Sequence, residues 1–344
     1  MILVTGASGL VGSHLVLHLA EQGLKVSAIY RSQKALFKTK ALFEMYNKVH
    51  LFDQITWILA DINDIPALEI AFENIDFVYH CAAKISFDPR DEEKLRKTNI
   101  EGTANIVNFC LEKKVKKLCF VSSIAALGDL PEYNSMSELG QVTTRIIDEE
   151  TDWNPEKPHS DYAISKYGAE MELWRGQQEG LKIVIVNPGV ILGPLPKSWN
   201  RNEGSFKLVS TVAKGLKFFT HGTTGFVSVF DVVNCMTLLM NSETVGTRYI
   251  LVAENVSYKT IAAILASSLK VNPPVREAKK WMTELAWRWD WLCAHLFFQK
   301  RKLTKAIAKS VHTEDLYSNT KVKNALYFNF ESIESICNRI AKYY

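Results

Sequence analysis

MILVTGASGLVGSHLVLHLAEQG, residues 1–23, places a short apolar run before three glycines and a helix-like stretch. A side chain at Gly6 would obstruct the tight turn, one at Gly9 would hold the backbone off a pyrophosphate, and one at Gly12 would push the helix away from the strand. Free N–H groups at the start of such a helix attract phosphate. The flanking strand and helix favour a dinucleotide site over a glycine-rich turn without a ligand.

Strand-like and helix-like segments alternate along the first half of the chain. The helix-length stretches include Val11 to Gln22 and Asp91 to Lys113. The strand-like runs are ILVTGA, KVSAIY, ITWILA, FVYHCAA, KKLCFVSS and KIVIVNPG. Most are continuously apolar, as in a parallel sheet that helices cover on both faces. The pattern predicts an α/β, Rossmann-type doubly wound parallel sheet.

The regular alternation weakens after Pro188, where NPGVILGPLPKSWNRNEG concentrates proline, glycine and asparagine. The later run GFVSVFDVVNCMTLLMN is predicted to be a strand and a helix that return to the main sheet. We therefore expect residues 1–187 with 224–255 to form the dinucleotide-binding Rossmann domain. Residues 188–223 with 256–344 would form a smaller C-terminal substrate-binding lobe.

Composition limits the classes of protein that the chain can represent. It has 344 residues, 47% of them apolar, which is enough for a sizeable core. A net charge of +4, spread along the chain, is too mild for a nucleic-acid binder. The six cysteines have no regular spacing, so neither a disulfide framework nor a metal site is expected. The start lacks the pattern of an export signal, and a cytoplasmic protein is expected.

Further motifs follow the glycines in a fixed order. They are Asp61-Ile62, HCAA at 80–83, Asn99 within TNIEGT, VSS at 121–123, YAISK at 162–166 and NPG at 187–189. With Thr5 before the GxxGxxG spacing, this set resembles the extended short-chain dehydrogenase/reductase family over nearly the whole chain. The resemblance implies the following cofactor contacts: Gly6, Ser8, Gly9, Leu10, Val11, Gly12, Tyr30, Arg31, Lys34, Asp61, Ile62, Cys81, Ala82, Ala83, Tyr162, Lys166, Pro188 and Val190. It also allows a homodimer.

The end of the second strand bears on the choice of nicotinamide cofactor. NAD enzymes usually carry a carboxylate there for the ribose hydroxyls, whereas this chain has Tyr30 followed by Arg31 and Lys34. A guanidinium can bind a 2′-phosphate through two parallel hydrogen bonds. The alternative is a solvated arginine on a loop. By resemblance, Asp61 contacts the adenine base instead, so NADP(H) is predicted in preference to NAD(H).

Tyr162 and Lys166 are four residues apart in a helix-like stretch, so their side chains share one face. A nearby ammonium would lower the pKa of a phenol from about 10 toward the range of general acid–base catalysis. We therefore predict Tyr162 and Lys166 as catalytic residues. By resemblance, Lys166 also holds the nicotinamide ribose, Ser123 orients the substrate oxygen, and Asn99 connects the lysine to solvent through a water.

Three functions are compatible with these motifs. The first is hydride transfer between NADP(H) and a ketone, an aldehyde or the corresponding alcohol. The second is a nucleotide-sugar epimerase or dehydratase, but the position of that group's phosphate-clamping arginine holds Thr224-Gly225. The third is an NADP(H)-binding redox sensor without turnover, which would not need a proton relay. The first is favoured.

The remaining sequence resembles dihydroflavonol reductases and 3-beta-hydroxysteroid dehydrogenases through VSAIYRS, HCAA and GFVSVFDVV. Residues 125–161 are predicted to form a wall of the substrate site. The acidic residues at 148–150 and 152 are interpreted as a solvated face or a helix start. His159 is close to Tyr162 in the chain and is taken as incidental.

Four of the eight tryptophans lie between Trp281 and Trp291. At helical spacing they form broad apolar stripes, interrupted by charges that make a membrane span improbable. Core packing or an apolar substrate lid is favoured over a helix lying on a membrane surface beside the basic run 300–302. A lid would suit a bulky apolar small-molecule substrate.

Overall fold

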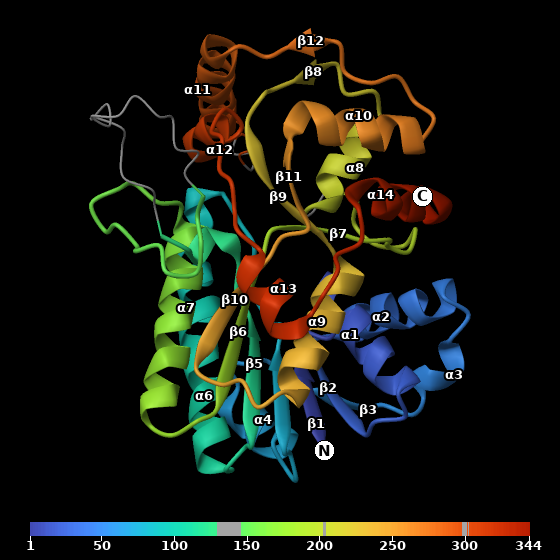
Figure 1. The fold of residues 1–344 in the computed structure, drawn as a ribbon, viewed down its shortest axis with the longest axis vertical. Coiled ribbons are helices and arrows are strands. Elements are labelled where there is room, and N and C mark those ends of the chain that lie inside the picture. The colour runs from blue at the N-terminus through green and yellow to red at the C-terminus, as the bar shows by residue number, and fades with distance from the viewer. Residues whose placement is uncertain (129–145, 202–203, 298–300, 302) are drawn as a thin grey trace.

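The computed structural model describes residues 1–128, 146–201, 204–297, 301 and 303–344 (Figure 1). Its main sheet has seven parallel strands in the order β10-β6-β5-β4-β1-β2-β3. These are β1 (Ile2–Thr5), β2 (Val26–Tyr30), β3 (Thr56–Leu59), β4 (Phe77–His80), β5 (Lys117–Val121), β6 (Ile183–Pro188) and β10 (Thr247–Leu251). Six of them are the six predicted runs, and the Rossmann-type α/β sheet is confirmed.

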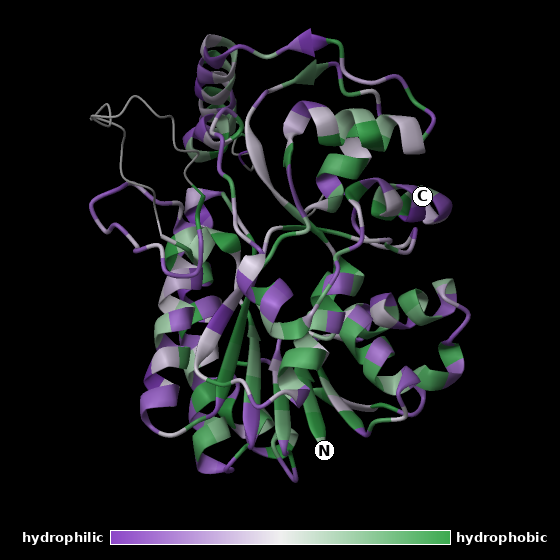
Figure 2. Ribbon diagram, viewed as in Figure 1, coloured by the Kyte–Doolittle hydropathy of each residue, from purple (hydrophilic) through white to green (hydrophobic). Residues whose placement is uncertain are grey.

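Helices cover both faces of this sheet (Figure 1). One face packs against α1 (Leu10–Glu21), α2 (Gln33–Met45) and α9 (Val229–Asn241), and the other against α4 (Ile65–Ala71), α6 (Gly102–Glu112) and α7 (Asp161–Gln178). Successive strand residues alternate between the two cores, as Leu3 and Val4 do. Burial on both faces explains why the central strands of this sheet are mostly green, and so hydrophobic, in Figure 2.

The helix predicted from Asp91 to Lys113 is a succession of helical segments. They are η1 (Pro89–Asp91), α5 (Glu92–Leu95), a π-helical segment η2 (Arg96–Glu101) and α6. Two further short segments, α3 (Val49–Phe52) and η3 (Ile124–Ala126), follow α2 and β5. The π-helical segment places Asn99 in the interior, where it is buried.

A smaller sheet of three strands has the order β11-β9-β7. Its strands are β7 (Val190–Leu192), β9 (Thr223–Ser228) and β11 (Glu254–Ser257). It shares a core with α8 (Phe206–Ala213), α10 (Tyr258–Ser268) and α14 (Ile333–Tyr343). The prediction that the strand of GFVSVFDVV returns to the main sheet is wrong, because β9 pairs with β7 and β11. The helix α9 that follows does pack on the main sheet.

The remaining elements lie toward the end of the chain. They are β8 (Phe218–Phe219) paired with β12 (Arg276–Glu277), and the helices α11 (Lys280–Leu296), α12 (Lys305–Ser310) and α13 (Thr320–Leu326). In Figure 1, α11 and α12 stand at the top of the view, beyond the upper end of α7.

Candidate active site

The glycine loop between β1 and α1 is closely packed at two of its three glycines. Gly6 has φ +67°, and a Cβ there would lie 2.5 Å from the backbone nitrogen of Ala82. A Cβ at Gly12 would lie 2.2 Å from the carbonyl oxygen of Gly6. At Gly9 the nearest atom is 3.4 Å away, an ordinary contact. Gly6 and Gly12 are therefore required by the fold itself, whereas Gly9 leaves space beside the loop.

Helix α1 begins at this loop without a side-chain cap. Gly9 is the N-cap residue in an extended conformation, and its N–H donates to the carbonyl of Gly6. Ser8, Leu10 and Val11 belong to the same turn. Uncapped N–H groups at a helix start favour an anionic group, and the missing Cβ at Gly9 lets that group approach the backbone. The residues present fit the pyrophosphate of a dinucleotide.

The ends of β2 and β3 carry the residues predicted to contact the adenosine half. Tyr30 is buried, while Arg31 and Lys34 are exposed, with Lys34 in the first turn of α2. Arg31 lies 3.8 Å from the carboxylate of Asp61, and both side chains are open to solvent. Asp61 also accepts a hydrogen bond of 2.9 Å from the N–H of Asn63. The exposed Arg31–Asp61 pair is weak, so the guanidinium can turn to another anion.

The end of β4 lies directly against the glycine loop. His80 is buried and its Nδ1 lies 2.6 Å from the hydroxyl of Thr5, which also accepts a bond from the N–H of Ala82. Burial, with the charge of Lys166 acting in the same direction, lowers the pKa of His80 to about 3. The imidazole is therefore neutral and ties β4 to β1. Cys81 and Ala82 are half-buried at this junction, and Ala83 is exposed.

Helix α7 carries Tyr162 and Lys166 one turn apart, as predicted, and the end of β5 places Ser123 beside the tyrosine. The hydroxyl of Ser123 lies close enough to the Tyr162 phenol to lower its pKa. The Ser123 hydroxyl also accepts a bond of 3.1 Å from the N–H of Ala125. Ser123, Tyr162 and Lys166 thus all lie near the carboxyl end of β5, the edge of the sheet where doubly wound folds bind their ligands.

The expectation that Lys166 lowers the pKa of Tyr162 is wrong for this structure. Burial raises the pKa of Tyr162 to about 12, and the nearby hydroxyl of Ser123 offsets only part of that effect. The phenolate is costly because little water remains to solvate it. Tyr162 is therefore a protonated phenol at neutral pH.

Lys166 is fully enclosed. Its Nζ donates a hydrogen bond of 2.8 Å to the carbonyl of Val121 and lies 4.6 Å from the centre of the Phe120 ring. Burial lowers the pKa of Lys166 to about 8, although the carboxylate of Glu170 acts in the opposite direction. The ammonium points toward β5. Because of its lowered pKa, half of the Lys166 side chains have lost their proton at about pH 8.

Asn99 lies behind the site in the π-helical segment, a feature that often marks functional positions. Its amide nitrogen donates to the carbonyl of Lys84 at 3.0 Å and to the hydroxyl of Ser165 at 2.9 Å. Its amide oxygen accepts the N–H of Lys84 at 2.7 Å. The side chain therefore joins the segment after β4 to α7. The water connection to Lys166 stays a prediction.

The last predicted cofactor contacts, Pro188 and Val190, lie at the end of β6 and the start of β7. They are next to Asn187, whose amide nitrogen donates to the carbonyl of Ser123 at 3.0 Å and to the carboxylate of Glu170 at 2.6 Å. Glu170 is completely buried and forms an ion pair of 3.3 Å with Arg248. Asn187, Glu170 and Arg248 thus form a buried network that holds the backbone of Ser123 in place.

The sequence did not reveal this polar network. Arg248 also donates to the carbonyl of Glu149, and the carboxylate of Glu149 accepts the N–H of Ile250 at 2.8 Å. Glu149 is buried, so its assignment to a solvated acidic face is wrong. The one available signal was the spacing of Glu170, which follows Lys166 by one helical turn.

Apolar side chains lie beside the tyrosine. The ring of Phe87 is 5.7 Å from that of Tyr162, and Phe87 and Ile85 are exposed. Trp153 stacks on His159 at 3.8 Å and on Tyr167 at 4.4 Å, which supports the view that His159 has a packing role. Of the predicted wall at 125–161, residues 129–145 lie outside the described part of the chain.

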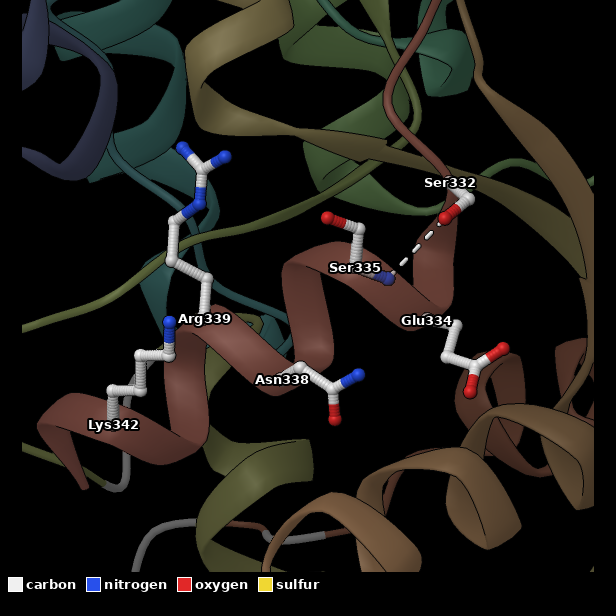
Figure 3. A pocket seen from close by; sticks show the side chains of 6 residues that line it. All are labelled: Ser332, Glu334, Ser335, Asn338, Arg339 and Lys342. Carbon is white, nitrogen blue, oxygen red and sulfur yellow. Dashed lines mark hydrogen bonds between the residues drawn. The ribbon is translucent and has the colours of Figure 1, made fainter.

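A surface pocket lies away from these residues, on α14 (Figure 3). Its lining side chains are polar and come from one helix and its N-cap: Ser332, Glu334, Ser335, Asn338, Arg339 and Lys342. The Ser332 hydroxyl accepts the N–H of Ser335 and so acts as an ordinary helix cap. The pocket contains none of the predicted site residues.

Comparison with known sequences gives two findings. Residues 2–252 match the model of the NAD dependent epimerase/dehydratase family. An anthocyanidin reductase of Arabidopsis thaliana is 30% identical over 279 residues, covering 76% of this chain and 78% of the relative.

Two solved structures share the fold. The yeast methylglyoxal/isovaleraldehyde reductase complexed with NADPH has a TM-score of 0.73 at 21% identity, covering 99% of this chain and 97% of that one. A Thermotoga maritima UDP-glucose 4-epimerase with UDP-glucose has a TM-score of 0.73 at 20% identity, with the same coverage. At these identities the likeness concerns the fold alone.

Proposed function

Because this chain belongs to the NAD dependent epimerase/dehydratase family, we propose that it is an NADP(H)-dependent oxidoreductase. The family and the homologous proteins indicate an NAD(P)-dependent enzyme of the oxidoreductase or epimerase type. Within that range we assign the reduction of a ketone or aldehyde, or the reverse oxidation of the alcohol. The substrate is a small apolar molecule.

The observation that carries this proposal is the position of Tyr162 on α7, one turn before Lys166, whose Nζ donates to the carbonyl of Val121 at the end of β5, just before Ser123. At neutral pH the phenol carries the proton that carbonyl reduction requires, and a cation near the phenol during the reaction would ease its release. Tyr162 gives its proton to the carbonyl oxygen, and the hydroxyl of Ser123 donates a hydrogen bond to the same oxygen. When bound, the reduced dinucleotide supplies the hydride that completes the alcohol.

The preference for NADP(H) rests on the charge at the end of β2. Arg31 and Lys34 are both exposed there, and Tyr30 stands where an NAD enzyme carries a carboxylate. The weak pair between Arg31 and Asp61 leaves the guanidinium available to a 2′-phosphate. NAD(H) offers no group of that charge.

The proposed substrate class rests on the surroundings of Tyr162. Phe87, whose ring is 5.7 Å from that of Tyr162, presents exposed apolar surface beside the phenol, and Ile85 two residues earlier is exposed too. In this proposal, residues 188–223 and 256–344 form the substrate-binding lobe. The boundaries are amended for β9 and β11, which both belong to the smaller sheet.

The test is an NADPH-oxidation screen across ketones and aldehydes, with NADH in parallel. We expect substrate-dependent consumption of NADPH that is faster than that of NADH. Interconversion of a nucleotide sugar without net consumption of the dinucleotide would favour the epimerase alternative. Tight NADPH binding with no turnover of either substrate class would favour the redox sensor.

A further inference from the structure

Helix α11 presents an apolar stripe to solvent. No residue of this helix is buried, so the expectation of core packing is wrong for this segment. Five apolar side chains fall within about 80° of the helix circumference. These stripe residues are Trp281, Leu285, Trp289, Leu292 and Leu296, with exposed fractions between 40% and 68%.

The opposite face of α11 holds the helix against the rest of the chain. The hydroxyl of Thr283 lies 2.9 Å from Nε2 of His312, and the carboxylate of Asp290 accepts the N–H of Leu303 at 3.2 Å. Arg301 donates to the carbonyl of Trp287 and lies 3.7 Å from Asp290. These contacts fix the rotation of the helix, so that the stripe points away from α12.

Positive charge lies at the start of the stripe and on α12 behind it. Residues 276–309 contain nine lysines and arginines but three acidic residues. Lys279 and Lys280 are exposed at the start of α11, and Lys305 and Lys309 are exposed on α12. Glu284 is paired with Arg288 at 2.6 Å, and Asp290 is paired with Arg301. The charge left for an outside partner is therefore positive.

We propose that the α11 stripe docks on the surface of a lipid bilayer that contains anionic lipids. Tryptophan and leucine on one face, with lysine and arginine beside them, are typical of helices that lie in the interface of a membrane. Tryptophan suits that depth because its ring is apolar and its N–H can remain hydrated. Among the described residues no helix is long and apolar enough to cross the membrane, so the contact is a surface contact.

Charge also favours lipid over a second copy of this chain. Lys279 and Lys280 are exposed at the start of the stripe, so a parallel pair of stripes would bring these lysines together. Anionic headgroups are attracted to the same side chains. The proposal does not depend on the catalytic assignment.

The experiment is co-sedimentation of the full chain with vesicles of phosphatidylcholine, alone or with about 30% phosphatidylglycerol. We expect sedimentation with the anionic vesicles, weakened by added salt. Leu285→Glu and Trp289→Glu should each reduce the bound fraction by about tenfold or more. Ile70→Glu is the matched control, since Ile70 on α4 is 62% exposed, close to the 58% of Leu285.

Retained binding in Ile70→Glu together with loss in both stripe variants supports the proposal, provided that circular dichroism shows all three variants folded. Should one stripe variant fail to fold, the other decides. No sedimentation of the wild-type chain, or equal sedimentation of all variants, overturns it. So does a wild-type dimer that becomes a monomer in Leu285→Glu without any vesicle binding.

Discussion

Asn187 donates a hydrogen bond of 2.6 Å to Glu170, a carboxylate that is completely buried. The same amide nitrogen reaches the carbonyl of Ser123, and Arg248 pairs with Glu170 from β10. Asn187 thus joins the backbone of Ser123, the proposed catalytic serine, to a buried carboxylate. Glu170 is a positioning residue in the proposed mechanism.

Glu170→Gln should reduce the free energy of unfolding by about 2–4 kcal/mol, because Arg248 would keep its charge without the buried partner. We also expect a lower kcat with a smaller change in KM, since Ser123 loses its support. Chemical denaturation and steady-state kinetics measure the two effects. Glu172→Gln is the control on the same helix, and it should cost about 0.5 kcal/mol or less, since Glu172 forms a partly exposed pair with Arg175. Equal effects of the two variants would contradict the assignment.

The glycine loop predicts different outcomes at two positions. Gly12→Ala places a Cβ 2.2 Å from the Gly6 carbonyl, so it should destabilise the fold by about 1–3 kcal/mol. Gly9→Ala meets nothing closer than 3.4 Å, so its stability should be nearly unchanged. Its affinity for NADPH should nevertheless fall by about tenfold, because the new methyl group stands where the phosphate approaches. Thermal melts with and without NADPH separate the effects. Unchanged NADPH affinity in Gly9→Ala would contradict the prediction that the pyrophosphate binds at this loop.

Arg31→Ala tests the choice of cofactor. The variant should bind NADPH about 10- to 100-fold more weakly, because a charge-assisted hydrogen bond to the 2′-phosphate is lost. Its affinity for NADH should not change. Isothermal titration with both dinucleotides gives the comparison, and Arg276→Ala on exposed β12 serves as the control. A parallel loss of affinity for NADH would contradict a specific contact with the 2′-phosphate.

The pH dependence of reduction should follow Lys166 and not Tyr162. Lys166 loses its proton near pH 8, whereas Tyr162 stays protonated to about pH 12. We expect kcat/KM to fall above about pH 8 as the buried ammonium disappears. Protein stability should change in the opposite direction. The pKa of Lys166 is about 8 in the folded protein and 10.5 in an unfolded chain, so burying the charged side chain destabilises the fold at neutral pH. This destabilisation is relieved as the pH rises from about 8 to 10.5. Lys166→Met should lack this relief in pH-dependent denaturation. A flat profile across pH 8 in the wild type would refute the assignment.

The main sheet and the glycine loop could be predicted from the sequence because their signals are local. Apolar runs separated by helix-length stretches identified β1 to β6, and the spacing of Gly6, Gly9 and Gly12 identified the loop. The spacing of Tyr162 and Lys166 likewise placed both residues on α7. Each of these patterns extends over a few residues of the chain.

The remaining features depend on contacts between distant segments. Glu149 and Ile250 are 101 residues apart, and no local pattern indicates that the carboxylate is buried against β10. The pKa of Tyr162 rises because surrounding elements exclude water, an effect that i, i+4 spacing does not reveal. The stripe on α11 has the periodicity of a packed helix, and only its surroundings show that it is exposed.

The most direct test of the proposed chemistry is the rate of NADPH-dependent carbonyl reduction by Tyr162→Phe, measured together with its affinity for NADPH. The matched control is Tyr167→Phe, on the same helix, which keeps the ring that stacks on Trp153. We predict that Tyr162→Phe loses at least about a hundredfold in kcat, because the general acid is removed, while NADPH affinity stays unchanged. Tyr167→Phe should keep both properties. Unimpaired turnover by Tyr162→Phe would contradict the proposal that this phenol donates the proton.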